Sequence, residues 1–521
     1  MKTVKNLLTA IMMGSAATIA IPSIAMPSPD VAYKVSDQAL TLDIHFQTKN
    51  YVYDNQWPVE KEAARLTNMH LNNIASMANI KTKQTFILML AAHDLPPILG
   101  GESIRDKVNR YGPEGAFIPM NDLIDKYAPH IKAYFEQHPD IKNAISSSDG
   151  QLYYIPYLPD GDLGRGYFIR TDWLKKLNLK VPQNIDELYN VLVAFRNQDP
   201  NGNGKKDEMP IFMRNWQELI RMVTFWDGRS TGSEKYHDFY INDNGELRYA
   251  YIEAGYKNGI RHLAKWYKED LIDPEIFTRG DRSREFLLAN NLGGMTHDWF
   301  ASTASYNDSI AKQVPGFEFK AMAPPASISG KRIEEHRRAT VSDDGWAMSF
   351  SNKNPIETIK YFDFFFTKTG RNLANYGVEG KQYDLIDGKP IFKQSIIKSN
   401  KPLTLQLREV GAQIPRGFQQ DYNYELQQPN QYALEYTKLY SQKVYFPKPF
   451  LGVELTDQEQ KIYDKYWPSI LGYMLEMQQS WILGYGDIDK DWDGYLSKLD
   501  KMGVQTIMAL MQNAYDRTYN R

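Results

Sequence analysis

The sequence contains no cysteine among its 521 residues. This absence excludes a disulfide framework, cysteine-ligated zinc and iron–sulfur centres, a thiol nucleophile and a lipid attached to an N-terminal cysteine. An excess of charge of one sign is also missing, because 61 basic side chains face 63 acidic ones. A balanced charge argues against a strong global field for nucleic acid or anionic lipid. Beyond the N-terminus no run approaches the ~20 apolar residues of a membrane span, so no transmembrane helix is expected in the mature chain.

The N-terminus has the order of a secretory signal peptide. Met1 to Lys5 is a short basic start, Leu7 to Ile21 is mostly apolar or small, and Ser23 and Ala25 are small residues at the positions that signal peptidase reads. We therefore predict a signal peptide over residues 1–25, with cleavage after Ala25; the alternative is a buried N-terminal helix. An exported chain without cysteine fits an oxidising compartment, and we expect a freely diffusing periplasmic protein.

Aromatic residues make up 13% of the chain, with 34 Tyr and 10 Trp. A sugar ring offers an apolar C–H face and a rim of hydroxyls, so Trp or Tyr beside Asp, Asn, Gln or Arg suits it. Any one such segment also fits an ordinary half-buried loop, but their repetition favours a sugar-binding site. The segments are Tyr51–Trp57, Tyr153–Tyr157, Thr296–Trp299, Asp343–Trp346 and Phe418–Tyr422.

Hydrophobic periodicity predicts an α/β protein. Leu40 to Phe46 reads as a strand, and helices are expected from Pro58 and after Asn184, where Glu187 completes a capping-box pattern. Breakers crowd into residues 156–166 between two apolar runs, which indicates a segment that crosses between lobes. At this length two or more lobes are expected.

The loop that begins at Asp199 has the spacing of a calcium-binding loop. Oxygen-bearing side chains fall at positions 1, 3 and 5, a glycine stands at position 6, and a backbone carbonyl is available at position 7. Pro210 occupies position 12, where an EF-hand has its bidentate glutamate, so Glu208 is the available substitute. The alternative is a solvated Asn-Gly turn without an ion. The predicted calcium ligands are Asp199, Asn201, Asn203, Lys205 through its carbonyl, Asp207 and Glu208.

Two other motifs favour structural interpretations. Asp489 to Asp500 matches most of an EF-hand pattern, but Trp492, Tyr495 and Leu499 recur at helical spacing, which predicts an amphipathic helix. Gly228-Arg-Ser230-Thr-Gly232 matches the serine-hydrolase pattern without the following helix, so we interpret it as a turn. Paired carboxylates are numerous, and the sequence alone leaves a glycosidase or lyase open.

Several of these segments resemble a known family, the extracellular solute-binding proteins of oligosaccharide ABC importers. Within that family the chain is most similar to periplasmic alginate-oligosaccharide-binding proteins, and the likeness runs in order along essentially the whole mature chain. The matching stretches are Gly115–Phe117, Tyr127–Ala133, Asp149–Pro156, Tyr167–Leu177, Pro182–Leu188, Asp199–Gly204, Gly293–Thr303, Asp421–Glu425 and Ala514–Arg517.

The resemblance implies a two-lobed periplasmic binding protein of type II-like fold. Each α/β lobe has a mixed sheet flanked by helices, and the ligand lies in the cleft between lobes. It also implies structural Ca²⁺ at the Asp199 loop, a cleft-lining Trp299 that stacks on a sugar ring, and partnership with a membrane permease and its ATPase. We place the N-terminal lobe at residues 26–160 and 346–400, and the C-terminal lobe at 161–345 and 401–521.

One departure from the family pattern concerns the sugar. Gln419 stands where alginate binders carry a stacking tryptophan, and Arg416 stands where an apolar residue is expected. A lost platform and an added cation suggest a different or more anionic oligosaccharide. Glycosaminoglycan fragments are the rival to alginate, since arginine pairs bidentately with carboxylate and sulfate.

The sequence therefore predicts a non-catalytic, monomeric binding protein for acidic, uronate-containing oligosaccharides, with no nucleic-acid partner. The rivals are a secreted lyase or hydrolase and a calcium-dependent adhesion protein. The predicted sugar-binding residues fall into three roles and a remainder. We predict ring stacking for Trp299, Trp346, Tyr422 and Trp57, carboxylate or sulfate recognition for Arg165 and Arg416, and hydroxyl binding for Asp160, His297, Asp298 and Gln419. Tyr157 and Asn55 are predicted to contact the sugar without a more specific role.

Overall fold

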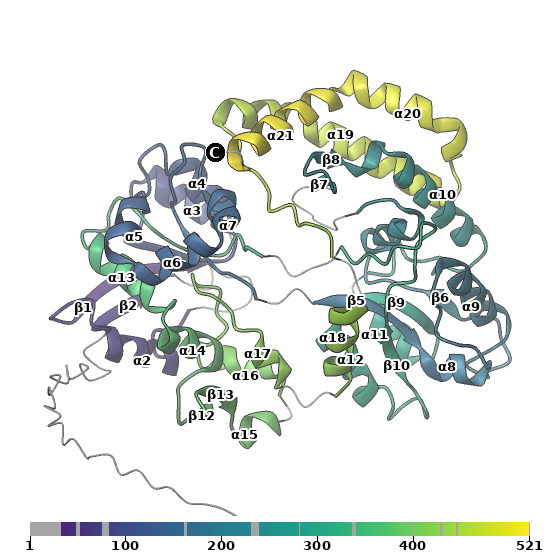
Figure 1. Ribbon diagram of the computed structural model, residues 1–521, viewed down its shortest axis with the longest axis horizontal. Helices are drawn as coiled ribbons and strands as arrows, with labels where there is room; N and C mark the ends of the chain where they lie inside the picture. The colour runs from purple at the N-terminus through teal and green to yellow at the C-terminus, as the bar shows by residue number, and fades with distance from the viewer. Residues whose placement is uncertain are drawn as a thin grey trace, which may run out of the picture.

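The computed structural model folds into two α/β lobes that lie side by side (Figure 1). It describes residues 33–47, 53–75, 83–160, 164–230, 239–280, 282–335, 340–399, 401–427, 431–443 and 446–519. The predicted signal peptide, residues 1–25, lies outside the described residues. Within the described part of the chain, no helix has the length and apolar character that crossing a membrane requires.

The first lobe is built on a five-stranded sheet of order β2-β1-β3-β11-β4. Strands β1 (Leu40–Gln47), β2 (Met69–Asn73) and β3 (Ile98–Gly101) are parallel to one another. Strand β11 (Gly345–Met348) comes from much later in the chain and pairs antiparallel with both β3 and β4 (Ile155–Pro156). The lobe is therefore discontinuous in sequence.

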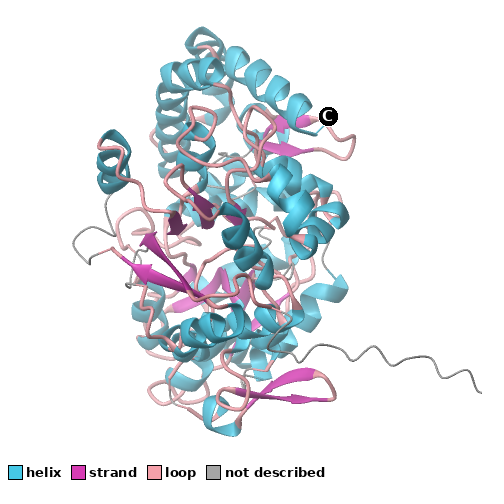
Figure 2. Ribbon diagram, turned by 90° about the vertical axis from the view of Figure 1, so that its left-hand side faces the viewer, coloured by secondary structure: helices cyan, strands magenta, loops and turns pink. Residues whose placement is uncertain are grey.

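Helices cover this first sheet, and they begin where the local sequence favours it. Proline at the first helical position starts α2, α6, α7 and α13, where its missing N–H is an orphan in any case. The helices are α2 (Pro58–Thr67), α3 (Lys83–Ala91), α4 (Arg105–Tyr111), α5 (Asn121–Tyr127), α6 (Pro129–Gln137), α7 (Pro139–Ile145), α13 (Pro355–Phe364), α14 (Lys368–Tyr376), α15 (Gln394–Ile397), α16 (Leu403–Glu409) and α17 (Asn423–Leu426). The hairpin of β12 (Tyr383–Ile386) and β13 (Lys389–Phe392) projects at the lower end (Figure 2).

The second lobe has a four-stranded sheet of order β10-β5-β9-β6. Strand β5 (Arg165–Arg170) is central and pairs antiparallel with β10 (Phe319–Met322) and β9 (Gly293–Trp299). Strand β6 (Met209–Ile211) runs parallel to β9 at the edge. β7 (Phe239–Ile241) and β8 (Leu247–Tyr249) form a separate hairpin.

The helices of the second lobe surround this sheet and form a helical layer above it in the view of Figure 1. Asn184 caps α9 by accepting the backbone N–H of Glu187 at 2.9 Å, as its sequence predicts. The helices are α8 (Thr171–Lys176), α9 (Ile185–Asn197), η1 (Trp216–Trp226), η2 (Ala250–Ile252), α10 (Ala254–Lys268), α11 (Ser283–Ala289), α12 (Phe300–Ser309), α18 (Gln431–Lys443), α19 (Asp457–Leu483), α20 (Ile488–Met502) and α21 (Val504–Tyr519).

The two lobes have separate hydrophobic cores. The first core holds the β1–β3 side chains together with Trp346 and Phe362, and the second holds Trp173, Trp226 and the apolar faces of α19 to α21. A third cluster, around Phe168, joins α12 and α18 to the second sheet. The chain thus passes between the lobes after Asp160, between Met322 and Gly345, and after Tyr424.

These cores divide the chain differently from the predicted boundary at residue 400. Leu407, Ile414 and Phe418 pack in the first core, although the sequence analysis assigned residues 401–521 to the second lobe. The physical reason is that residues 411–421 return to α14, where the Gln413 N–H donates to the Ala374 carbonyl at 2.8 Å. We propose that the third crossing, after Tyr424, is the last lobe boundary.

Candidate functional site

The two strands β5 and β9 bring predicted binding residues together at the end of the second sheet that faces the first lobe (Figure 1). Arg165 pairs directly with Trp299, and Tyr167 pairs with His297. Because side chains alternate along a strand, all four lie on the same face of the sheet. The Arg165 guanidinium lies over the Trp299 indole, 4.2 Å from the ring centroid. Trp299 remains 38% exposed, so this large aromatic is accessible at the edge of the lobe.

The other side of Arg165 is occupied by a buried carboxylate. Its guanidinium donates to Glu218 at 2.9 Å, and Glu218, 2% exposed, also pairs with Arg214 at 2.6 Å and Arg221 at 3.6 Å. Burial raises the pKa of Glu218, but the three arginines outweigh it and hold that pKa below its usual value. Glu218 is therefore an ionised anchor for three cations.

His297 lies in the same network and is buried. Its Nδ1 accepts from Arg221 at 3.4 Å, so Nε2 carries the proton and donates to Glu334 at 3.0 Å. Burial lowers the pKa of His297, and the Glu334 carboxylate opposes that shift only in part. The imidazole is neutral at pH 7 and orders the network, rather than being presented to a ligand.

Asp298 points to the opposite face of β9 and is fully buried. Its carboxylate accepts the Trp299 N–H at 2.8 Å and the Thr303 hydroxyl at 3.1 Å, and it pairs with Arg284. It thus fixes the turn from β9 into α12 and with it the position of Trp299. The hydroxyl-binding roles predicted for His297 and Asp298 are corrected by this burial, because both side chains are satisfied inside the lobe.

Four predicted residues gather where the chain leaves the first lobe. Leu158 and Gln419 form a parallel β-bridge, and the Asp160 carboxylate accepts the Tyr422 N–H at 3.2 Å. The Tyr157 ring lies 5.1 Å from that of Phe418. The Tyr422 hydroxyl lies 3.3 Å from that of Thr437 on α18, which belongs to the second lobe. Tyr157, Asp160, Gln419 and Tyr422 are all partly exposed.

Two predicted contacts lie in the first core instead. Trp346 is completely buried and stacks on Phe362 with ring centroids 4.4 Å apart. Arg416 is 1% exposed and forms a buried ion pair with Glu60. The stacking role of Trp346 and the anion-binding role of Arg416 are therefore corrected, because neither side chain is presented to solvent.

Trp57 and Asn55 lie at the start of α2, also in the first lobe. Trp57 is half-buried, with its ring 5.4 Å from that of Tyr53, while Asn55 is exposed. Gly411 lies so close to Trp57 that a Cβ at position 411 would be 2.8 Å from the Trp57 Cβ. Trp57 therefore packs against the segment that leads to Gln419. Its role in stacking on a sugar stays a prediction.

The predicted calcium loop joins α9 to β6, on the side of the second lobe away from the first (Figure 1). Asp199 accepts three backbone N–H groups, those of Gly202 at 2.8 Å, Asn203 at 3.0 Å and Gly204 at 2.9 Å. Both glycines have φ of 77°, which a side chain rarely adopts. The loop is therefore tightly folded around one carboxylate.

The donor set of this loop fits a calcium ion. Glu208 is 1% exposed, its Oε2 has no hydrogen-bond partner within the described residues, and burial raises its pKa. The amide groups of Asn201 and Asn203 turn toward Asp207, at 3.2 and 3.0 Å. A buried carboxylate oxygen without a partner costs free energy that a hard cation removes. No three His, Asp or Glu side chains of the described residues form a metal cluster on their own. A calcium ion at this loop would therefore need the asparagine side chains and a backbone carbonyl as further ligands.

The second EF-hand-like stretch is a helix, as the spacing of its apolar residues indicates. α20 buries Trp492, Tyr495 and Leu499, and Asp489 pairs with Arg261 at 2.5 Å. The Asp491 carboxylate accepts a hydrogen bond from the Trp481 indole N–H at 3.0 Å. These aspartates are structural.

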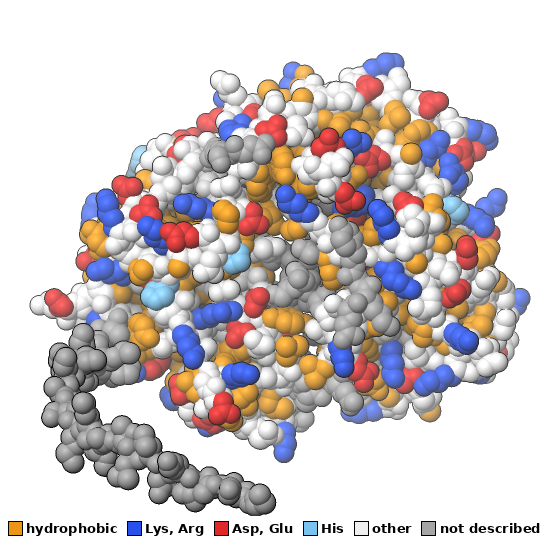
Figure 3. Space-filling view, in the orientation of Figure 1, with side chains coloured by type: hydrophobic (Ala, Val, Ile, Leu, Met, Phe, Trp, Pro, Cys, Tyr) orange, Lys and Arg blue, Asp and Glu red, His pale blue; other side chains and the backbone are white. Residues whose placement is uncertain are grey.

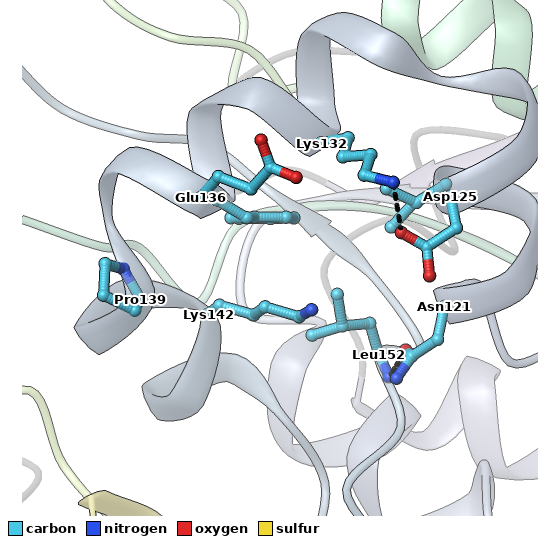
Figure 4. Close-up of a pocket in the computed structure, with 9 residues that line it drawn as sticks. Asn121, Asp125, Lys132, Glu136, Pro139, Lys142 and Leu152 are labelled. Atoms are coloured by element: carbon cyan, nitrogen blue, oxygen red, sulfur yellow. Dashed lines mark hydrogen bonds and ion pairs between the residues drawn. The ribbon is translucent and has the colours of Figure 1, made fainter.

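A pocket of about 240 Å³ lies elsewhere, on the first lobe between α5, α6 and α7 (Figure 4). Lys132 and Asp125 form an ion pair at 3.2 Å on its rim, and Phe135 and Leu152 supply apolar walls. None of the predicted sugar contacts lines it. On the face shown in Figure 3, basic and acidic side chains are interspersed over both lobes.

Arg214, Glu218, Arg221 and Glu334 are not among the site residues predicted from the sequence. A signal was present, because Arg214, Glu218 and Arg221 recur at four- and three-residue spacing, which brings their side chains to one side of a helical turn. Their proximity to Trp299 depends on the packing of η1 beneath the sheet, and no local pattern shows it.

Comparison with known proteins identifies relatives along nearly the whole chain. A crystal structure of the alginate-binding protein AlgQ2 without calcium ion is 49% identical, with a TM-score of 0.78, and the match covers 93% of this chain and 99% of AlgQ2. The polygalacturonan/rhamnogalacturonan-binding protein YtcQ of Bacillus subtilis (strain 168) is 30% identical over 370 residues, 67% of this chain and 68% of YtcQ.

A further relative is the fructooligosaccharide ABC transporter substrate-binding protein FusA of Streptococcus pneumoniae serotype 4 (strain ATCC BAA-334 / TIGR4). It is 24% identical over 485 residues, 88% of this chain and 86% of FusA. No protein-family model matches the chain. The two-lobed architecture expected from the sequence is confirmed by these neighbours.

Proposed function

The chain belongs to the solute-binding proteins of oligosaccharide ABC transporters, and we propose that its ligands are acidic, uronate-containing oligosaccharides such as alginate or glycosaminoglycan fragments. The observation that carries the proposal is Trp299, exposed at the edge of the second lobe against the guanidinium of Arg165. The indole suits a sugar ring, and the cation beside it favours a ring that carries a carboxylate. AlgQ2 is named for alginate binding and YtcQ for polygalacturonan and rhamnogalacturonan.

The binding residues come from both lobes. Trp299 is the platform on the second lobe, and the partly exposed Tyr157, Asp160, Gln419 and Tyr422 lie at the segments where the chain leaves the first. Ligand that contacts both sets stabilises the closed arrangement and shifts an open–closed equilibrium toward it. Substrate then passes to a membrane permease and its ATPase.

Calorimetric titration of the mature chain with alginate, hyaluronan and polygalacturonate tetrasaccharides tests this function. We expect saturable binding of at least one acidic tetrasaccharide and no binding of fructooligosaccharides, the ligands for which FusA is named. Small-angle scattering is expected to show compaction on binding. Binding of neutral sugars alone contradicts the proposal.

The same proposal makes the chain a monomeric, non-enzymatic protein of the periplasm with a structural Ca²⁺. Its relatives are substrate-binding proteins, which supports the absence of catalysis. Incubation with alginate or hyaluronan polymer should release no unsaturated or reducing ends, whereas steady release supports a lyase or hydrolase. Intact-mass analysis of the exported protein should place its N-terminus at Met26.

A further inference from the structure

The cations behind Trp299 outnumber the anions that compensate them. Arg165, Arg214 and Arg221 surround Glu218, and we call these four residues the guanidinium cluster. Of the neighbouring groups, Glu334 pairs with the neutral His297, and Glu335 pairs with Arg229. Among these described residues, three guanidinium groups thus share the carboxylate of Glu218, and Glu334 also attracts Arg221.

The excess charge is poorly solvated. The Nε atoms of Arg165 and Arg221 are buried and make no hydrogen bond within the described residues. Burial and the repulsion from Arg221 lower the pKa of Arg165 to about 10, against the attraction of Glu218. A buried cation that is incompletely paired is stabilised by any further anion that reaches it, and the field of such a cluster is little screened by solvent.

The cluster reaches the Trp299 ring through Arg165 and reaches solvent through Arg214. Arg165 is sandwiched between Glu218 and the Trp299 ring, so its charge lies directly behind the exposed indole. The Arg214 side chain is 27% exposed and lies on the same Glu218 oxygen, Oε1. A sugar stacked on Trp299 therefore lies within the field of at least two guanidinium groups.

We propose that the guanidinium cluster makes the Trp299 platform selective for negatively charged sugars. Arg165 is a positioning residue that orients the indole and places positive charge behind it, and Arg214 is a specificity-determining residue that faces the sugar carboxylate or sulfate. This inference rests on the proposed function and deepens it, because it assigns the preference for acid to named residues. Glu218 limits the selectivity by neutralising part of the charge.

The test compares each acidic oligosaccharide with its neutral counterpart. Alginate and hyaluronan tetrasaccharides and their carboxyl-reduced forms are titrated into the wild-type chain and into Arg165→Gln and Arg214→Gln. We expect each substitution to weaken binding of the acidic tetrasaccharide about tenfold and that of the reduced form less than about threefold, so that the ratio of affinities falls. The wild-type preference should also weaken at high ionic strength.

Two further variants separate charge from structure. Glu218→Gln removes the compensating charge at constant shape and should raise the acid-to-neutral ratio, opposite to the arginine variants. Arg165→Lys keeps the charge but loses the planar fork, so it should retain the ratio better than Arg165→Gln. Arg261→Gln is the control, because Arg261 pairs with Asp489 between α10 and α20, outside the site.

The outcomes distinguish this inference from the function on which it rests. Equal loss of acidic and neutral ligands in the arginine variants, or an unchanged ratio in all of them, overturns the selectivity role while leaving oligosaccharide binding intact. If the wild-type chain binds neither acidic tetrasaccharide, the proposed function itself fails and the selectivity role with it. If an arginine variant is too unstable to titrate, the ratio of acidic to neutral affinity in Glu218→Gln still tests the selectivity role.

Discussion

Arg105 on α4 of the first lobe forms a buried ion pair with Glu454, which precedes α19 of the second lobe. Their closest atoms are 2.6 Å apart, and the Arg105 side chain is only 2% exposed. The same guanidinium reaches Asp343 at 3.5 Å, in the segment that crosses between the lobes. α21 also packs against α7 nearby, so the two lobes contact each other beside the crossing segments.

Replacing Arg105 with Met should destabilise the protein by about 3 kcal/mol, because a largely buried carboxylate loses its partner. It should also loosen the lobes, which small-angle scattering detects as a larger radius of gyration without ligand. Thermal unfolding of the Arg105→Met, Glu454→Gln double variant should recover part of the loss. Arg65→Met is the control, since the Arg65 side chain is 52% exposed in its pair with Glu62. An effect of Arg105→Met no larger than that of the control contradicts a role for this pair.

Truncation of Trp299 should weaken oligosaccharide binding by about 2 kcal/mol, through the loss of an exposed aromatic platform. Folding should be little changed, because the side chain is 38% exposed. Calorimetry on Trp299→Ala measures the first effect and thermal unfolding the second. Tyr485→Ala, at an 84% exposed aromatic outside the site, serves as the matched control. Unchanged affinity in Trp299→Ala removes the platform from the mechanism.

Calcium should stabilise the loop between α9 and β6. Adding the ion to chelator-treated protein should raise the melting temperature, because Glu208 Oε2 and the Asp199 carboxylate then gain a cation. Glu208→Gln should abolish that increase and leave sugar affinity within about twofold, since the loop lies away from the first lobe. Asp493→Asn on α20 should respond to calcium as the wild type does. A calcium response that survives Glu208→Gln assigns the ion to other residues.

The Glu318 carboxylate should make the free energy of unfolding depend on pH in the acidic range. Hydrogen bonds from Lys175, Lys320 and Thr171 outweigh the effect of its partial burial and lower the pKa of Glu318 to about 2, from 4.5. A depressed carboxyl pKa contributes stability that is complete above the unfolded value and is lost as the pH falls through the folded one. Glu318→Gln should therefore cost about 1 kcal/mol at neutral pH, because solvent reaches the cluster.

That difference between wild type and Glu318→Gln should shrink between pH 4.5 and about 2. Denaturant unfolding at several pH values measures it. Lys175→Met removes one donor and should produce a smaller change of the same sign. A difference that is constant over this pH range shows that the Glu318 charge does not contribute.

Much of the local structure followed from the sequence. The helix after Asn184, the strand at Leu40 and the helix through Trp492 are where their patterns predict them, because capping and periodicity act over a few residues. The tight turn of the Asp199 loop followed from the same local chemistry. The resemblance to solute-binding proteins supplied the lobes, and the relatives confirmed them.

The sequence did not separate the aromatic residues by environment. Trp299 and Trp346 both follow an aspartate within two positions, yet one is partly exposed and the other is stacked in the core. Arg165 and Arg416 were equal candidates for an anion, and each proved to be paired with a glutamate from another element. Burial depends on what packs over a residue, and that partner is distant in the chain.

The sequence by itself thus determined the helices, the loop geometry, the absence of cysteine chemistry and the family of the chain. Only the tertiary structure decided which tryptophan faces outward and where its charge comes from. The reason is physical: the register of β5 against β9 sets Arg165 opposite Trp299, and the packing of η1 beneath them brings Glu218 and its arginines. The contacts of Arg165 with Trp299 and with Glu218 join residues more than fifty positions apart, beyond the reach of any local pattern.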